Sequence, residues 1–184
     1  MTAAALANLR SEMVEATRLS FDACRRDHAG ETIYAYALVM CGVGGEALQP
    51  WCHTEESNAK QEAKHPSKSE REAGVRRYCP DEWWPVASGP VKTSRGRGWD
   101  DIRADLNGLH IESKNREPYV VPEMLIETLE TLNREGYFGT GKPRDAVTLM
   151  IYISDNPLSE EWWPDSVRRL NPPAVRKRFK AAAG

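Results

Sequence analysis

Cysteines and long hydrophobic runs are scarce in this sequence. The sequence has four cysteines, Cys24, Cys41, Cys52 and Cys79. No pair of them is separated by two intervening residues, which excludes the Cys-x-x-Cys spacing of zinc knuckles and thioredoxin-like motifs. None stands out as half of a secreted disulfide framework. No stretch approaches the roughly 18 apolar residues that a membrane span requires, and residues 1–10 lack the features of a signal peptide. We therefore expect a soluble, reduced, cytoplasmic protein with no membrane partner.

An excess of one charge sign is also missing. Lysine and arginine number 25 and aspartate and glutamate 27, which gives a net charge of −2. This near balance argues against a dedicated nucleic-acid binder, because such domains usually carry a basic excess. A chain of this length buries roughly 70% of the surface that its unfolded form exposes, so it needs neither a disulfide nor a metal to fold. Residues 1–184 are therefore expected to form a single domain.

Most sequence motifs that are typical of enzymes are absent. The sequence has no Walker phosphate loop, dinucleotide fingerprint, nucleophile elbow or His-Glu-x-x-His zinc helix. Gly42, Gly44 and Gly45 follow an apolar run, but the glycine pattern of a nucleotide-binding loop fails at Ala47. A hairpin turn explains these glycines better. Neither a cofactor nor a metal is expected.

Hydrophobic periodicity predicts the secondary structure. Apolar residues at spacings of three and four predict a long helix over residues 3–27. Residues 33–40 are apolar on both alternations, which is typical of a central strand, and residues 47–53 can return as its antiparallel neighbour. Residues 146–153 also lack a polar face and are expected as a second central strand. The same patterns, with caps and prolines, predict further helices over residues 100–112, from 122 to before 136, over 159–170 and after 172.

These elements predict an α/β protein of the α+β type, with a small mixed or mainly antiparallel sheet flanked by helices. Thr54 is the expected cap of a helix that continues into the charged residues 57–77. That segment is interpreted as an exposed helix interrupted at Pro66, or as a partly mobile insertion. Residues 88–98 have the composition of a flexible loop, and residues 181–184 are expected to fray.

The best catalytic candidate in the sequence is His53 with Glu55. A histidine exchanges protons near neutral pH, and Asp155 at the end of a buried strand could join it. Each residue also has a structural explanation: His53 ends a strand, Glu55 follows a helix cap, and Asp155 lies in an Asp-Asn-Pro turn. A zinc site from Cys52, His53, His65 and Cys79 has suitable ligand types, but its spacing matches no common site.

Tryptophans and acidic residues form the best candidate for a protein-binding surface. Two tryptophan pairs, at 83–84 and 162–163, are each followed by proline. Exposed tryptophan beside carboxylates is favourable for protein recognition. The densest such grouping comprises Asp81, Trp84, Trp99, Asp100 and Asp101. The alternatives are that the tryptophans belong to the core and that the aspartates at 100 and 101 cap a helix.

Seven stretches together resemble a bacterial family of unknown function, domain-of-unknown-function family 4303. They are residues 21–24, 34–38, 53–56, 78–83, 135–139, 149–155 and 166–173, and the most specific is Ser-Val-Arg-Arg-Leu-Asn-Pro-Pro at 166–173. The sequence departs from the family pattern at His53, where asparagine is expected, and in its basic segments at 60–77 and 88–98. The resemblance supplies no enzymatic activity to carry over.

What the resemblance implies is a small cytosolic protein encoded near polymorphic toxins. The leading hypothesis is therefore an immunity protein, similar to an antitoxin, whose partner is a toxin domain encoded nearby. An enzyme that uses His53, Glu55 and Asp155 as a hydrolase or transferase is the alternative. A regulatory scaffold without a toxin partner is a third possibility.

Overall fold

The computed structural model describes the chain except for residues 42–46, 84–85, 88–90, 114–119, 155–158 and 184. Side chains are also left out at residues 86–87, 112–113, 159–160 and 183. The strands are β1 (Ile33–Cys41), β2 (Ala47–Thr54), β3 (Val86–Ala87) and β4 (Thr148–Ser154). The helices are α1 (Ala3–Asp27), α2 (Glu55–Lys64), α3 (Glu70–Tyr78), the short 3-10 helix η1 (Pro80–Glu82), α4 (Trp99–Ser113), α5 (Val120–Arg134), α6 (Lys142–Ala146), α7 (Ser159–Leu170) and α8 (Pro173–Ala183).

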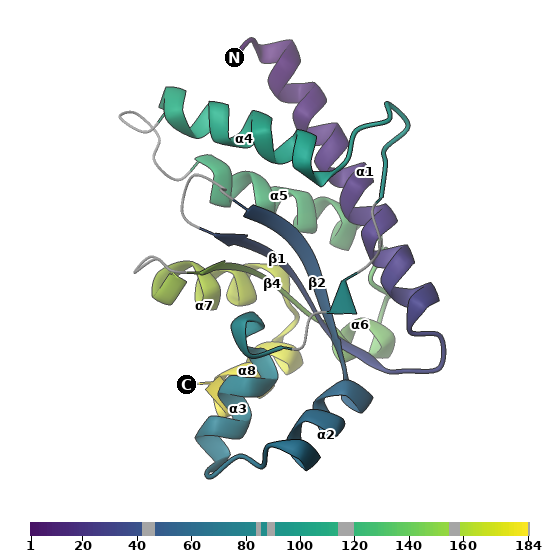
Figure 1. The fold of residues 1–184 in the computed structure, drawn as a ribbon, viewed down its shortest axis with the longest axis vertical. Helices are drawn as coiled ribbons and strands as arrows, with labels where there is room; N and C mark the ends of the chain where they lie inside the picture. Colours follow the sequence, from purple (N-terminus) through teal and green to yellow (C-terminus); the bar gives the residue numbers. More distant parts are fainter. Residues whose placement is uncertain (42–46, 84–85, 88–90, 114–119, 155–158, 184) are drawn as a thin grey trace.

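The strands form one mixed sheet in the order β3-β2-β1-β4. Strand β1 pairs antiparallel with β2 and parallel with β4, and the two residues of β3 extend the sheet beyond β2. Helices surround this sheet (Figure 1). The predicted fold class, a single α+β domain with a small mixed sheet, is confirmed.

The sheet separates two hydrophobic clusters. Alternate residues of β1 supply each of them, because neighbouring side chains on a strand point to opposite faces. Tyr36, Leu38 and Met40 belong to the first core cluster, together with residues of α1, α4 and α5. Ala37 and Val39 belong to the second core cluster, together with residues of α3 and α8. Strand β1 is therefore covered on both faces, as its sequence predicts.

The prediction that residues 146–153 form a central strand was wrong about its position. Strand β4 pairs with β1 and lies at the edge of the sheet, although all seven of its residues are buried. Helix α7 runs beside this edge and supplies residues to both clusters, Trp162 and Leu170 to the first and Val167 to the second. A neighbouring helix thus excludes water from this strand as completely as another strand would.

Most helix boundaries agree with the sequence pattern. Helix α1 has the predicted bounds, and Thr54 caps α2 by accepting a hydrogen bond from the Ser57 N–H (3.0 Å). Gly136, just beyond α5, takes a positive φ of 72°, a backbone conformation that glycine adopts without strain. Helix α5 begins at Val120, before Pro122. The short α6 and β3 were not predicted.

Most residues of the charged segment 57–77 are exposed or half-buried, and its two helices agree with the interpretation of a helix interrupted at Pro66. The segment forms α2 and α3 on either side of Pro66, and the buried Arg76 donates to Glu62 (2.9 Å) and to the backbone carbonyl of His65. Gly74 of α3 lies so close to α8 that a Cβ there would come within 1.7 Å of the Ala182 carbonyl oxygen. Helix α8 extends to Ala183, and Ala182 packs against the second core cluster. None of the helices in the described part of the chain is long and apolar enough to cross a bilayer.

Candidate functional site

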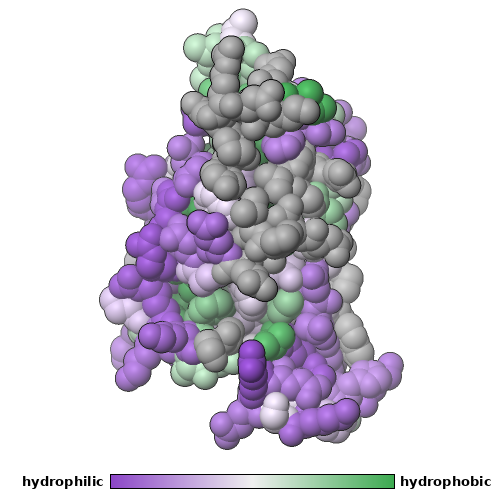
Figure 2. All heavy atoms as spheres, turned by 90° about the vertical axis from the view of Figure 1, so that its left-hand side faces the viewer, coloured by the Kyte–Doolittle hydropathy of each residue, from purple (hydrophilic) through white to green (hydrophobic). Residues whose placement is uncertain are grey.

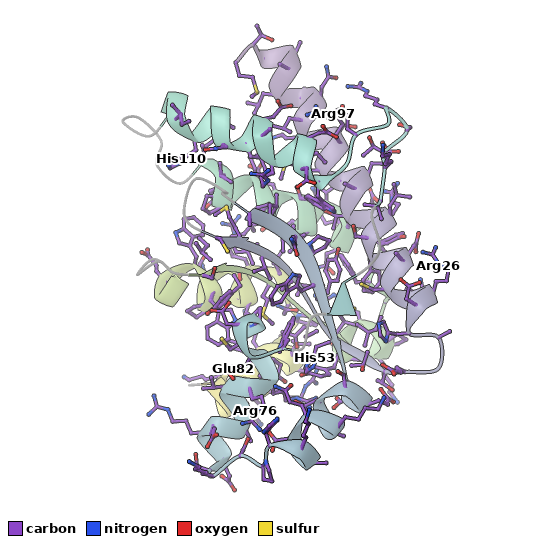
Figure 3. The ribbon with its side chains drawn as sticks, in the orientation of Figure 1. Arg26, His53, Arg76, Glu82, Arg97 and His110 are labelled. Carbon is purple, nitrogen blue, oxygen red and sulfur yellow. The ribbon has the colours of Figure 1, made fainter. Side chains whose placement is uncertain are left out.

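His53 lies at the end of β2, buried between the sheet and the α2–α3 pair (Figure 3). Its Nδ1 is 2.7 Å from the Tyr34 hydroxyl, and its ring stacks on Trp83 at a centroid distance of 5.3 Å. The Tyr34 hydroxyl donates to the Arg77 carbonyl oxygen (2.7 Å), so the proton between Tyr34 and His53 belongs to Nδ1. Nε2 is the nitrogen left to accept a proton, yet it is buried and has no hydrogen-bond partner among the described residues.

Burial is the main cause of the low pKa of His53. The pKa of His53 is lowered to about 4, mainly by burial and also by the nearby positive charge of Arg77, while the negative charge of Glu55 opposes the change. The imidazole is therefore neutral at pH 7. A general base needs a nitrogen that reaches the substrate, whereas Nε2 of His53 faces protein.

Glu55 pairs with Arg77 and not with His53. Both Glu55 oxygens accept hydrogen bonds from the Arg77 guanidinium, at 2.8 and 2.5 Å. The same guanidinium lies 4.0 Å from the centre of the Tyr34 ring. Arg77 thereby links the end of α3 to β1 and to the start of α2. The geometry supports the structural explanation of His53 and Glu55, because the carboxylate that could orient the histidine is engaged elsewhere.

Asp155, the third residue of the enzyme hypothesis, lies outside the described residues. Strand β4 ends one residue earlier, at Ser154. On the face of the molecule at this end of the sheet, the described side chains are mostly hydrophilic, with a few apolar ones among them (Figure 2). Nowhere in the described part of the chain do three His, Cys, Asp or Glu side chains gather as metal ligands would, and this includes Cys52, His53, His65 and Cys79.

Asp81 of the proposed partner-binding group lies on η1, on the side of the second core cluster. Its carboxylate accepts a hydrogen bond from the Tyr152 hydroxyl (2.8 Å). Trp83, two residues later, is buried in the same cluster and donates through its indole nitrogen to the Arg77 carbonyl oxygen (3.1 Å). Trp84 falls outside the described residues.

Trp99, Asp100 and Asp101 form the first turn of α4. Trp99 is half-buried against the first core cluster, and its indole N–H donates to the Ser20 hydroxyl of α1 (2.9 Å). Asp101 accepts a hydrogen bond from the Gly98 N–H (2.8 Å), as the capping explanation expects. The Asp100 side chain is 99% exposed and has one weak ionic contact, with Arg103 at 3.7 Å. The two groups of residues lie on opposite faces of the sheet, so the structure does not bring Asp81 together with Trp99.

The basic loop before α4 is fixed to α1 by a buried carboxylate. Arg97 donates to Glu12 (2.7 Å) and to Asp105 (2.7 Å), and Arg95 contacts Glu12 at 3.2 Å. Figure 3 shows Arg97 beside the junction of α1 and α4. The Glu12 side chain is only 4% exposed, so the two arginines compensate a charge that would otherwise be costly to bury. The only sign of these ion pairs in the sequence is that Glu12 is an acidic residue next to the apolar stripe of the first helix.

A second histidine, missed by the sequence reasoning, borders a cavity of about 490 Å³. His28 Nδ1 lies 2.9 Å from a Glu31 oxygen, and the same oxygen accepts a hydrogen bond from the Thr54 hydroxyl (2.7 Å). The bonds from Thr54 and His28 lower the pKa of Glu31. The arrangement ties the end of α1 to the end of β2.

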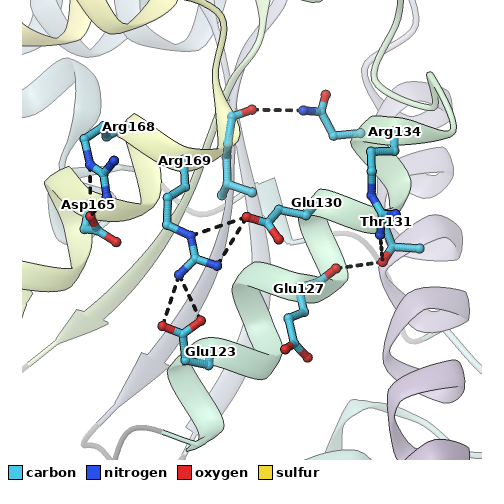
Figure 4. Close-up of polar contacts among 10 residues, drawn as sticks. Glu123, Glu127, Glu130, Thr131, Arg134, Asp165, Arg168 and Arg169 are labelled. Atoms are coloured by element: carbon cyan, nitrogen blue, oxygen red, sulfur yellow. Dashed lines mark hydrogen bonds and ion pairs between the residues drawn. The ribbon is translucent and has the colours of Figure 1, made fainter.

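The stretch at 166–173 stabilises the edge of the sheet. Asn171 donates to the Leu149 carbonyl (2.6 Å) and accepts from the Leu149 N–H (2.8 Å), and Ser166 accepts from the Ile151 N–H (3.1 Å). Arg169 binds Glu123 and Glu130 of α5 and so joins α7 to α5 (Figure 4). The most specific part of the family resemblance therefore has a structural role.

Arg144 completes this arrangement from α6. Its buried guanidinium donates to Asn133 Oδ1 (2.6 Å), to Asn171 Oδ1 (3.1 Å) and to the carbonyl oxygens of Val147 and Leu170. Burial lowers the pKa of Arg144 to about 10, so it stays charged at neutral pH. All these acceptors are neutral oxygens.

The fold and these contacts define a small α+β protein with a helix-covered mixed sheet. A family model described as domain of unknown function (DUF4303) matches residues 13–172, and the chain belongs to this family. Neither the curated proteins nor the solved structures that were searched gave a match.

Proposed function

We propose that this protein is a cytoplasmic immunity protein that neutralises a bacterial toxin by binding it stoichiometrically and covering its active site. The proposal rests first on the resemblance of the family to small cytosolic proteins encoded near polymorphic toxins. It rests also on the surface at the start of α4. There, Trp99, Asp100 and Asp101 combine a partly exposed aromatic side chain with carboxylates.

The observation that carries the proposal is the fixed position of Trp99 beside a fully solvated carboxylate. Packing against the first core cluster and the hydrogen bond to Ser20 hold the indole in place before any partner arrives. A side chain that is already ordered loses little entropy on binding, and tryptophan is enriched among the residues that dominate binding energy. The Asp100 carboxylate, 99% exposed, is free to face a cationic group on the partner.

Charge complementarity supplies the reason for choosing a toxin that acts on nucleic acid or nucleotides. Active sites that bind phosphates are usually basic, because cations must neutralise the phosphate charge. Carboxylates placed opposite such a site raise the rate of association, and an aromatic side chain contributes buried contact area. Covering the site would then inhibit the toxin without any chemical step.

The first test is titration calorimetry with the purified product of a gene adjacent to the one that encodes this chain. We expect a one-to-one complex and loss of toxin activity at the same ratio. Inhibition at far lower ratios would indicate catalysis and would contradict occlusion. Absence of binding to every neighbouring gene product would contradict the immunity role and would favour a regulatory scaffold.

A further inference from the structure

A cavity of about 390 Å³ opens where the end of α3, helix α6 and the middle of α8 meet the first residues of β1 and β4. Its lining includes Arg77, Lys142 and Arg178 from the three helices, and Tyr34 and Thr148 from the two strands. The cavity lies apart from the Trp99 surface, since Tyr34 belongs to the second core cluster and Trp99 packs on the first. Its size is within the range of pockets that hold small molecules.

The charges around this cavity leave a positive excess. Two carboxylates line it, Glu55 and Asp145, and both oxygens of Glu55 are bound by Arg77. Arg178 donates to the backbone carbonyl of Asp145, which is a neutral acceptor. Among the described residues Lys142 forms no ion pair. Three cations, Arg77, Lys142 and Arg178, therefore stand against two carboxylates in the lining, which leaves one net positive charge.

Further positive charge lies behind and beside the cavity. Arg144, which precedes Asp145, is buried, and its hydrogen bonds in the part of the chain that the structure describes go to the neutral oxygens named above. Helix α8 contains no acidic residue, and its exposed Arg176, Lys177 and Lys180 have no carboxylate partner in the part of the chain that the structure describes. Most other arginines in the protein are paired with carboxylates. The field at this end of the molecule therefore favours an anion, although the net charge of the chain is −2.

We propose that this cavity binds the phosphate group of a small phosphorylated molecule. Lys142 and Arg178 supply the charge, because ammonium and guanidinium donors form the strong charge-assisted hydrogen bonds that phosphate oxygens accept. The cavity is large enough to admit the organic group of a phosphate ester as well as the phosphate.

The test is titration calorimetry at low salt with inorganic phosphate, glycerol phosphate and, as the neutral control, glycerol. We expect both phosphates to bind and glycerol not to bind. Tighter binding of the ester would assign the site to phosphorylated metabolites, and equal or tighter binding of inorganic phosphate would assign it to the free ion. If neither phosphate produced a heat of binding at the highest concentrations of protein and ligand that stay in solution, the proposal would be overturned.

Two substitutions on one helix separate a specific site from general attraction. Arg178 lines the cavity, whereas Lys180 is exposed on the same helix outside it. Arg178→Ala should weaken phosphate binding by about tenfold or more, and Lys180→Ala by less than about twofold. Lys142→Ala should act like Arg178→Ala. Equal weakening by Arg178→Ala and Lys180→Ala would overturn the site in favour of diffuse charge attraction, and melting curves confirm that each variant is folded.

Discussion

The side-chain amide of Asn171 pairs with the backbone of Leu149 through two hydrogen bonds: its Oδ1 accepts from the Leu149 N–H, and its Nδ2 donates to the Leu149 carbonyl oxygen. Asn171 thus replaces the neighbouring strand that β4 lacks on this side. An edge strand leaves such groups free to pair with another chain, and natural proteins commonly cover or block them. Here the polar side chain of Asn171, the residue just after α7, blocks the edge of β4 at Leu149.

Replacing Asn171 by leucine should lower the free energy of unfolding by about 2–6 kcal/mol. The substitution keeps a side chain of similar size but leaves two buried backbone groups of Leu149 without partners, and each such group costs roughly 1–3 kcal/mol. Urea denaturation measures the change. Asn8→Leu, at an exposed position on α1, is the control and should change stability little. A change for Asn171→Leu as small as for the control would contradict the edge role.

Replacing Leu149 by alanine tests the burial of β4. Leu149 is fully buried in the first core cluster, so its truncation should cost about 2–5 kcal/mol of unfolding free energy. Ile111→Ala provides the control, because Ile111 is 61% exposed and loses little contact on truncation. If the two variants unfolded at the same urea concentration, Leu149 would not be part of the core.

The pKa of His53 predicts how stability depends on pH. In the unfolded chain the imidazole takes up a proton below its ordinary value of 6.5, whereas in the folded protein it stays neutral down to about pH 4. The unfolded state therefore binds more protons between these values, and its stabilisation lowers the free energy of unfolding as the pH falls. The contribution of His53 is fully present above pH 6.5 and falls by up to about 3 kcal/mol by pH 4.

His53→Asn is the matched variant for this pH dependence, since asparagine is the residue expected from the family resemblance and does not titrate. Its stability should fall less than that of the wild type between pH 6.5 and pH 4. The same variant should still protect against the toxin, because His53 is assigned a structural role. Equal pH profiles would contradict the low pKa, and loss of protection by a folded variant with normal partner affinity would revive the enzyme hypothesis.

The sequence predicts the elements better than their positions. The long stripe of α1 and the apolar run of β1 determine their own structure, because each pattern repeats over many residues. The edge position of β4 could not be predicted, since burial by α7 and burial by a strand produce the same apolar sequence. Asn171 and Pro172 were expected to start the final helix, whereas the pairing of Asn171 with Leu149 depends on how α7 docks.

Candidate site residues were harder to place, because their roles depend on contacts between distant segments. Glu12 and Arg97 stand 85 residues apart, and the only sign of their ion pair in the sequence is an acidic residue next to the apolar stripe of the first helix. Asp81 and Trp99 are close in sequence but lie on opposite faces of the sheet. Nearness in sequence therefore suggested one acidic–aromatic surface, whereas the fold leaves Trp99, Asp100 and Asp101 together.

The most direct test of the proposed function is the rate at which Asp100→Lys associates with the toxin, followed by stopped-flow at low salt. Glu70→Lys is the control, because Asp100 and Glu70 are both exposed acids in the first turn of a helix and their reversals carry similar folding costs. Helices α4 and α3 lie toward opposite ends of the molecule (Figure 1). The account predicts that Asp100→Lys slows association by about three- to tenfold while Glu70→Lys has little effect. Equal association rates for the two variants would contradict binding through the start of α4.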